Sequence, residues 1–598
     1  MSVRPQRKST GDFTGWGPRM MERLTLSRAL AVERTWPVFI DLAIAAVLLA
    51  GFYAILWIAK FWFSSAVPEV KIHLAPSHLP LYAFYSVVRI FVAYALSLGF
   101  AIAYGYTAAY NKRLETLMIA TLDILQSIPV LSFLPGVMLA MMSLFPSRQF
   151  GIEFGAILLI FTGEVWNMAF SFYTSLKSIP RELMEACQVN RFSRLQRLFH
   201  LELPFAAIGL IWNSIVSVAN GWFFLMVCEM FPVGSRKFRL PGLGSYLQTA
   251  ASRGEMVALA WGLGTMVLII VTTDQLLWRP LIAWSDKFKF ENVESAERVT
   301  SPVLHALRNS RMLSAIGQRT FGPVAERFYA GLAERRRRQE PRPEPTPAVQ
   351  RRRAVWWLAG IALAGGVGLA AYHAVGLMEG IHLHEFTTLL AGAGLTLLRV
   401  NAALVLGSLW TIPVGVAIGF NPKLSQVLQP VAQIAASFPA TALFPLIVIA
   451  LESVGVGLGA GSIALMLLAA QWYILFNVIA GAQAIPSELR EVARLFRFRE
   501  WQRWTTVILP GIFPFLITGL ITASGGAWNA SIVAEYFDLK GRTLATLGLG
   551  AQISAASDRG NYPVLLAGTI IMALMVVTIN RLVWRPLYHL AETRYRLE

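Results

Sequence analysis

Residues 185–204, EACQVNRFSRLQRLFHLELP, have a counterpart at residues 491–510, EVARLFRFREWQRWTTVILP. Each stretch opens with a glutamate and small residues, is basic and amphipathic in its middle, and ends in Leu-Pro where a long apolar run begins. A charged helix of this kind does not lie in hydrocarbon, where a charge costs several kcal/mol. We therefore expect two surface helices, at 181–199 and 487–505, that lie at a membrane surface and face a soluble partner.

The rest of the chain is apolar enough to build a membrane protein. Of its 598 residues, 56% are hydrophobic and 14% are charged, whereas soluble domains carry about 25% charged residues. Apolar runs of about 20 residues, long enough to cross a bilayer, recur along its length. The composition predicts an all-α polytopic membrane protein with about twelve transmembrane helices.

The net charge of +18 has two possible origins, a nucleic-acid surface or basic loops beside a membrane. The arginine runs flank apolar spans, which is typical of cytoplasmic loops that contact anionic membrane lipid. We therefore expect no nucleic-acid partner, and both termini in the cytoplasm. Cys187 and Cys228 stand alone, without the spacing of metal ligands, so we expect no disulfide framework. The histidines, His382 and His384 among them, are typical of structural or exposed positions, so we expect no metal site.

The paired stretches belong to a duplication of most of the chain. In the front of each half, matching residues such as Arg89 and Arg399 lie 310 positions apart; later the offset is 306, as for Trp166 and Trp472. Each surface helix follows the fourth predicted span of its half, which indicates two parallel six-span repeats. The predicted parts are a basic cytoplasmic tail (1–37), a first repeat (38–284), a basic cytoplasmic linker (285–353), a second repeat (354–590) and a short cytoplasmic tail (591–598).

The paired stretches resemble the cytoplasmic loop of binding-protein-dependent ABC importer permeases. That loop reads Glu-Ala-Ala, three residues, Gly, nine residues, Ile, one residue and Leu-Pro. The residues at its start, glycine slot and end are Glu185, Ala186, Arg191, Leu203 and Pro204 in the first copy and Glu491, Ala493, Arg497, Leu509 and Pro510 in the second. An arginine occupies the glycine slot in both copies.

The sequence around Trp222 and Glu229, ahead of Gly242-Leu243-Gly244, is similar to the nitrate, sulfonate and taurine group of these permeases. The resemblance implies a multi-pass permease of the bacterial cytoplasmic (inner) membrane that imports a small anion of that type. Each surface helix would then be a coupling helix that binds one of two copies of a cytoplasmic ABC ATPase. The resemblance also implies a periplasmic or extracellular substrate-binding protein.

The chain itself contains no Gly-x-x-x-x-Gly-Lys-Ser/Thr loop, the backbone cradle that holds nucleotide phosphates. We therefore expect a transport subunit that is not an enzyme and binds no cofactor, with ATP-Mg bound by the partner ATPase.

Charged residues inside the predicted spans are candidates for the substrate pathway. Arg89 and Arg399 lie about 30 Å of helix from the inner ends of their spans, and Glu229 and Glu535 lie at a similar depth. Two roles are open for these four residues: a structural ion pair within each half, or an electrostatic lining for an anionic substrate.

Three further residues extend this candidate set. Glu164 lies near the middle of its span, and its repeat partner is Ala470. An unmatched acid at that depth is a functional-site hypothesis. Asp123 and its counterpart Gln433 precede Ser-x-Pro sequences that free backbone carbonyls in mid-span. These residues either line the pathway or serve helix packing.

Two other classes of protein compete with the ABC permease. A secondary active transporter can also have twelve spans in two parallel repeats. It would need no partner subunit, however, and would therefore leave the two matched surface helices unexplained. A membrane-embedded enzyme acting on lipid would need a catalytic group of residues, and the sequence offers none that we can identify. ATP-dependent flux separates the permease from the secondary transporter.

Overall fold

The computed structural model describes residues 70–146, 149–233, 236–288, 301–310 and 375–594, together with the single residues 42, 46, 62, 64, 365, 368, 369, 372 and 373. These residues fall into two units. The larger unit comprises the described parts of 62–278, 288–290 and 342–598, and the smaller one comprises those of 1–61, 279–287 and 291–341. The larger unit contains most of both copies of the repeat, so the repeat can be examined within it.

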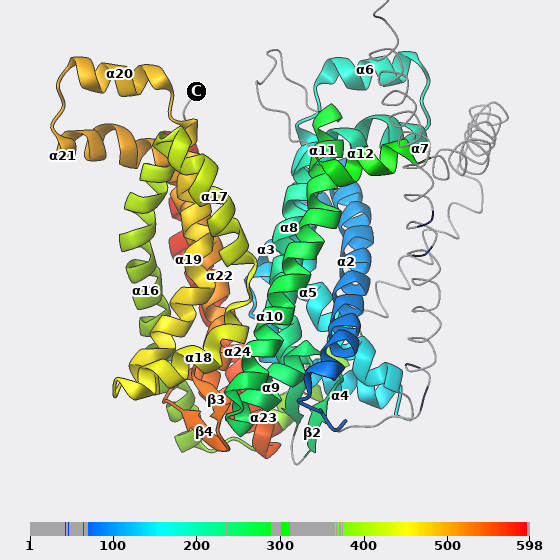
Figure 1. The fold of residues 1–598 in the computed structure, drawn as a ribbon, viewed down its shortest axis with the longest axis vertical. Coiled ribbons are helices and arrows are strands. Elements are labelled where there is room, and N and C mark those ends of the chain that lie inside the picture. The colour runs from blue at the N-terminus through cyan, green and yellow to red at the C-terminus, as the bar shows by residue number, and fades with distance from the viewer. Residues whose placement is uncertain are drawn as a thin grey trace, which may run out of the picture. The chain divides into compact units, whose positions relative to one another are not determined.

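The first copy forms a series of long helices joined by short elements (Figure 1). Its elements are η1 Pro76–His78, α2 Leu79–Tyr110, α3 Glu115–Ser127, η2 Val130–Phe133, α4 Leu134–Leu144, α5 Gln149–Lys177, α6 Arg181–Val189, α7 Arg194–Arg197, η3 Leu198–Glu202, α8 Leu203–Cys228, β1 Met230–Val233, β2 Arg236–Arg239, α9 Leu243–Arg253, α10 Met256–Thr273 and η4 Asp274–Trp278. The smaller unit holds α11 Arg279–Ser285, the first two residues of η5 Asp286–Phe288, and α12 Pro302–Asn309.

The second copy repeats this order of elements. It comprises α16 Leu383–Phe420, α17 Pro422–Ser437, α18 Ala440–Ser453, α19 Leu458–Ala484, α20 Ser487–Leu495, α21 Glu500–Arg503, η7 Trp504–Ile508, α22 Leu509–Ala534, β3 Tyr536–Leu539, β4 Arg542–Ala545, α23 Leu549–Arg559, α24 Tyr562–Ile579, η8 Asn580–Trp584 and α25 Arg585–Arg594. The all-α membrane fold in two repeats is thereby confirmed.

Eight helices within the described ranges are long and apolar enough to cross a membrane. The third span, predicted from the sequence at about 117–144, is different, because 115–126 and 130–144 form two helices with an 82° bend between them. The ninth span, predicted at about 424–451, is likewise split into α17 and α18. Both breaks fall at a Ser-x-Pro sequence, where proline removes a backbone donor and disfavours the helical conformation of the preceding residue. The first and seventh spans, predicted at about 38–63 and 355–377, lie largely outside the described residues.

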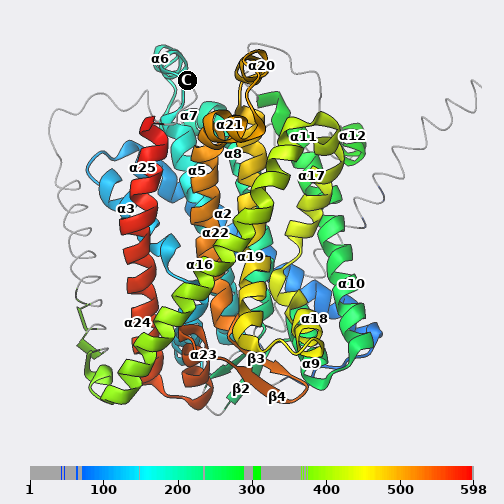
Figure 2. The same cartoon turned by 90° about the vertical axis from the view of Figure 1, so that its left-hand side faces the viewer.

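The two copies have the same orientation in the larger unit. Helices α6 and α20 lie at one end, and the two β-hairpins lie at the opposite end with α9 and α23 (Figure 2). We call these the coupling end and the hairpin end. Each hairpin is a pair of antiparallel strands, β1 with β2 and β3 with β4. The sequence did not indicate these strands.

The core of each copy is a helix packed between two others. Helix α5 packs between α2 and α8, and α19 packs between α16 and α22. Small residues allow the close approach: a Cβ atom on Gly105 would lie 2.9 Å from the Phe172 ring, and one on Gly415 would lie 2.8 Å from Val478. In lipid, where burial of apolar surface gains little, such packing is what drives helices together.

Four π-helical segments recur within the described ranges, each ending two residues before a proline. Proline has no N–H, and its ring crowds the carbonyl four residues earlier. A wider π turn relieves this crowding without breaking the helix. The segments η3 and η7 therefore carry the chain continuously from the coupling end into α8 and α22.

Candidate coupling segments and substrate cavity

Each predicted surface helix is in fact two short helices joined by a tight turn, so the expectation of one continuous helix was wrong. In the first copy α6 ends at Val189 and α7 begins at Arg194; in the second, α20 ends at Leu495 and α21 begins at Glu500. We call residues 181–202 and 487–508 the first and second coupling segments, after the role that the sequence predicts for them. A polar helix of four residues follows each turn and leads through a π turn to the next span.

The turns have identical geometry in the two segments. Arg191 and Arg497 have φ angles of 54° and 51°, in the left-handed region. Around Arg191, the Phe192 N–H donates to the Cys187 carbonyl at 2.9 Å and the Arg191 N–H donates to the Gln188 carbonyl at 2.9 Å. These two bonds define the Schellman motif, which ends helices most often with glycine at this position.

The second segment closes its helix with the same pair of bonds. The Phe498 N–H donates to the Ala493 carbonyl and the Arg497 N–H donates to the Arg494 carbonyl, both at 3.0 Å. The arginines thus hold the conformation that the glycine of the permease pattern would adopt, at the cost of some backbone strain.

The predicted coupling residues divide into exposed and buried ones. Glu185, Ala186 and Arg191 are exposed, as are Glu491 and Arg497, whereas Ala493 is buried. Leu203, Pro204, Leu509 and Pro510 are half-buried, where the segments enter α8 and α22. Cys187 is the counterpart of Ala493, and burial raises the pKa of its thiol.

A hydrogen-bonded cluster attaches the first coupling segment to α2. Glu202 accepts from Arg197 Nε at 2.5 Å and from the Tyr110 hydroxyl at 2.6 Å. The Arg197 guanidinium also lies over the Tyr110 ring, 4.6 Å from its centroid. In the second copy the positions of Tyr110 and Glu202 hold Phe420 and Ile508. The two segments are therefore attached differently.

The four charged residues near the hairpin end form an ion pair in each copy. Arg89 Nη1 donates to Glu229 Oε1 at 2.7 Å, and Arg399 Nη1 donates to Glu535 Oε1 at 2.9 Å. Glu229 also accepts from the Gly244 N–H at 2.7 Å, and Glu535 accepts from the Gly550 N–H at 3.0 Å. Each glutamate thereby attaches the helix after the hairpin to two spans.

Glycine is required where these carboxylates pack. A Cβ atom on Gly242 would lie 2.2 Å from Glu229 Oε1, and one on Gly548 would lie 2.2 Å from Glu535 Oε2. Because Gly242 and Gly548 have extended backbones, the requirement is one of space. This explains why glycine recurs at this place in both copies.

The remaining pathway candidates lie in different surroundings. Glu164 is buried, and neither of its carboxylate oxygens has a hydrogen-bond partner among the described residues. Its Oε1 would be 2.2 Å from a Cβ atom on Gly221 of α8. Asp123 lies in α3, but its side chain is outside the described residues. Gln433 lines the central cavity.

The central cavity lies between the two copies and has a volume of about 460 Å³. Equivalent positions of the copies face each other across it: Trp166 and Asn167 correspond to Trp472 and Tyr473, and Phe223 corresponds to Asn529. The polar lining residues carry amides and hydroxyls, and none of the described lining residues is charged. Among the predicted pathway residues whose side chains the structure describes, Gln433 is therefore the one that lines the cavity.

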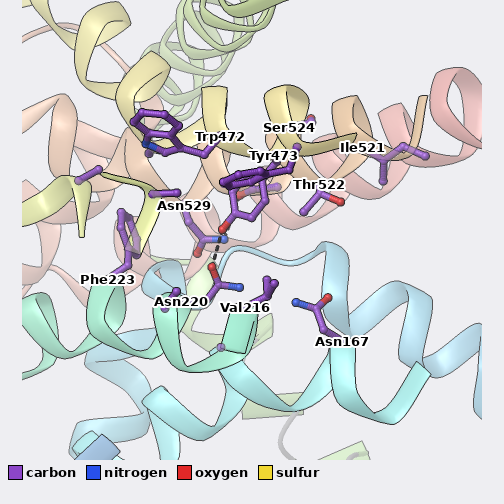
Figure 3. A pocket seen from close by; sticks show the side chains of 18 of the residues that line it. Asn167, Val216, Asn220, Phe223, Trp472, Tyr473, Ile521, Thr522, Ser524 and Asn529 are labelled. Carbon is purple, nitrogen blue, oxygen red and sulfur yellow. Dashed lines mark hydrogen bonds between the residues drawn. The ribbon is translucent and has the colours of Figure 1, made fainter. Parts of the chain in front are cut away.

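A hydrogen bond crosses the cavity between the copies. The Tyr473 hydroxyl of α19 donates to the Asn220 amide oxygen of α8 (Figure 3). Asn167 and Thr522 also extend toward this space in the close-up. The sequence analysis missed Asn167, Asn220 and Asn529. Their neutral amides within otherwise apolar spans could have indicated them, because a buried amide in a span is unfavourable unless it is hydrogen-bonded or faces a cavity.

Comparison with known proteins gives the family. The family model described as "Binding-protein-dependent transport system inner membrane component" matches residues 95–274 and again 411–590, together more than half of the chain. The first match begins within α2 and the second within α16, so each contains one coupling segment and one side of the cavity.

Individual relatives agree with this match. The taurine transport system permease protein TauC of Escherichia coli is 31% identical over 187 residues, which are 31% of this chain and 64% of that protein. A nitrate import permease protein NrtB of Leptolyngbya laminosa is 27% identical over 188 residues, 31% of this chain and 64% of that protein. The putative ABC transporter permease MJ0413 of Methanocaldococcus jannaschii is 26% identical over 234 residues, 38% of this chain and 83% of that protein. The chain thus spans a little under two thirds of the first two relatives.

The match of the family model to both copies, each with its coupling segment and its wall of the central cavity, leads to one conclusion: this chain is a multi-pass member of the binding-protein-dependent transport system inner membrane components, with two permease domains fused in one polypeptide.

Proposed function

We propose that this chain forms the complete transmembrane pathway of an ATP-driven ABC importer, and that its two coupling segments bind two copies of a separate ATPase subunit. The repetition of the coupling segment, with the same turn in the same register, is the observation that carries this proposal. One chain offers two equivalent docking elements at one end (Figure 2).

The surface of the coupling segments supports a protein partner. Val189 and Leu495 end α6 and α20 and are 81% and 80% exposed, and Trp501 of α21 is 76% exposed. Apolar side chains this exposed mark an interaction surface when they gather. Glu185 and Glu491 lie on the same short helices and are also exposed, so a partner can combine apolar contacts with charge pairs.

We further propose a small anion as the substrate. The cavity offers amide and hydroxyl donors from both copies without a carboxylate among the described lining residues. Neutral donors can hold an anion by hydrogen bonds and still release it, because no opposite charge holds it in place. Relatives named for taurine, nitrate, bicarbonate and aliphatic sulfonate transport support the same class.

The direction of transport follows from the same proposal. The coupling end would face the cytoplasm, where the ATPases bind, and the hairpin end would face a substrate-binding protein on the other side. ATP binding would close the ATPases and move the coupling segments, and the spans would then change the side to which the cavity opens. ATP-Mg would be held by the partner subunits.

Reconstitution into liposomes tests the function. The chain is incorporated with its ATPase subunit and a substrate-binding protein, and uptake of labelled nitrate, taurine and bicarbonate is measured with and without ATP. The proposal predicts uptake of at least one of these anions that requires ATP and both partners. Uptake by the chain alone, driven by an ion gradient, would instead establish a secondary active transporter.

A further inference from the structure

The ion-pair networks of the two copies share most of their hydrogen bonds. Ser86 and Thr396 are repeat partners, and each hydroxyl donates to the glutamate of its copy and accepts the N–H of Leu243 or Leu549 at 2.9 Å. The arginines also donate to equivalent carbonyls, Arg89 to Pro241 at 2.9 Å and Arg399 to Leu547 at 2.8 Å. Because these bonds match, the differences around the two arginines are informative.

The first copy contains a second carboxylate that the second copy lacks. Glu153 of α5 binds the outer edge of Arg89, with Nε donating to Oε2 at 2.6 Å and Nη2 donating to Oε1 at 2.7 Å. This is the forked arrangement in which a guanidinium binds an oxyanion most strongly. The position of Glu153 is taken by Gly459 in the second copy.

The corresponding edge of Arg399 is therefore open. A Cβ atom on Gly459 would lie 4.0 Å from Arg399 Nη2 and 3.4 Å from Thr546 Oγ1, so the space that a side chain would fill lies against the guanidinium. Arg399 Nε donates no hydrogen bond to the residues that the structure describes. The Arg399 side chain is 12% exposed, whereas that of Arg89 is 1% exposed.

Beside this edge of Arg399, the second copy has a hydroxyl group that the first copy lacks. Thr546 replaces Leu240 of the first copy and accepts from Arg399 Nη2 at 3.0 Å. Because this bond uses a lone pair, the hydroxyl hydrogen remains able to donate. Arg399 Nε, the second hydrogen of Nη2 and the Thr546 hydroxyl thus provide three donors around one space.

We propose that this space binds a small oxyanion, such as a carboxylate or nitrate, in the place that the Glu153 carboxylate takes in the first copy. The charges agree with this. Arg89, Glu153 and Glu229 together carry −1, whereas Arg399 and Glu535 together carry 0, so one bound monoanion makes the two networks equal. The start of α19 at Leu458, one residue before Gly459, adds a favourable field for an anion.

This anion site is separate from the central cavity, because neither Arg399, Gly459 nor Thr546 is among the residues that line the cavity. It therefore goes beyond the proposed transport function. A binding measurement on the full chain in lipid nanodiscs, without ATPase and without transport, can test it alone.

The test compares thermal unfolding in sodium formate and in sodium chloride at constant ionic strength. The site predicts that formate raises the unfolding temperature of the unaltered chain in a saturable way and more than chloride does. In Gly459→Glu a covalent carboxylate occupies the space, so the apparent formate affinity should fall by at least about tenfold. An equal formate response in Gly459→Glu and in the unaltered chain would overturn the proposal, as would a response to formate no larger than that to chloride.

The first copy provides the converse variant. Glu153→Ala opens the same edge on Arg89, so this chain should be less stable than the unaltered one and should regain stability in formate. Arg399→Lys keeps the positive charge but removes the paired N–H donors of the guanidinium, so it should weaken the formate response. This second variant tests the site even if Gly459→Glu fails to fold. Formate responses in these two variants that match the unaltered chain would also refute the site.

Discussion

Arg191 and Arg497, 306 positions apart in the sequence, share one left-handed backbone conformation, with φ angles of 54° and 51°. An L-residue with a side chain adopts this conformation at a cost of about 1 kcal/mol. The chain accepts that cost twice, at the same point of two coupling segments. The segment therefore adopts this turn even where the residue at its centre is arginine and not glycine.

The strain at this turn gives the first prediction. Arg497→Gly should stabilise the chain by about 0.5–1 kcal/mol, because glycine adopts a positive φ without strain. Arg497→Val should destabilise it by about 1–2 kcal/mol, because a β-branched residue is a rare outlier there. Thermal unfolding of the two variants in the same detergent checks the order. A Val variant as stable as the Gly variant would show that the turn bears no strain.

Space beside the buried glutamates gives the second prediction. Gly548→Ala places a Cβ atom 2.2 Å from Glu535 Oε2, so the ion pair with Arg399 must move. We expect a loss of about 3 kcal/mol, as for overpacking beside a buried charge pair. Gly394→Ala is the matched control, since among the described residues no atom beyond its own turn of helix lies within 4 Å of its added Cβ. Comparable unfolding temperatures for the two alanine variants would contradict this account.

The cluster that attaches the first coupling segment to α2 gives the third prediction. Glu202→Gln and Tyr110→Phe each remove part of the hydrogen bonding around Arg197. Because both residues bond through the buried Glu202 carboxylate, their effects should not add, and a double-mutant cycle should give a coupling energy of about 1–3 kcal/mol. Additive losses within about 0.5 kcal/mol would mean that the two contacts are independent.

The cavity gives the fourth prediction. Asn220→Ala removes an amide from the cavity and the hydrogen bond from Tyr473. In the reconstituted transport assay we expect the KM for the anion to rise about tenfold, the effect of one lost hydrogen bond. Asn401→Ala is the control, because that amide donates to the Leu397 carbonyl of its own helix and does not line the cavity. An unchanged KM in Asn220→Ala would remove Asn220 from the substrate site.

Much of the architecture could be predicted from the sequence. The spans predicted at about 81–110 and 203–231 begin and end within a few residues of α2 and α8, because hydropathy over about 20 residues is a strong signal. The offsets of 310 and 306 correctly paired Arg89 with Arg399 and Glu229 with Glu535, and these are bonded in equivalent ways. Repetition thus carried information that a single copy would lack.

Other features depend on contacts that a sequence pattern does not contain. The turn at Arg191 was hidden because arginine, unlike glycine, does not signal a positive φ. Glu153 was missed as the second partner of Arg89, since its counterpart is Gly459 and the repeat comparison sought identities. The cavity was missed for the opposite reason. The sequence analysis selected mainly charged residues as pathway candidates, whereas the described side chains that line the cavity are neutral.

The central claim is that one copy of this chain binds two ATPase subunits through its coupling segments. Native mass spectrometry of the complex purified from membranes in mild detergent tests it most directly. Glu452→Lys, an exposed charge reversal outside the coupling segments, is the control for Glu185→Lys combined with Glu491→Lys. The account predicts one chain with two ATPase subunits in the unaltered and control complexes, and loss of ATPase in the double variant. A chain that purifies without an ATPase, or a double variant that retains both subunits, would contradict it.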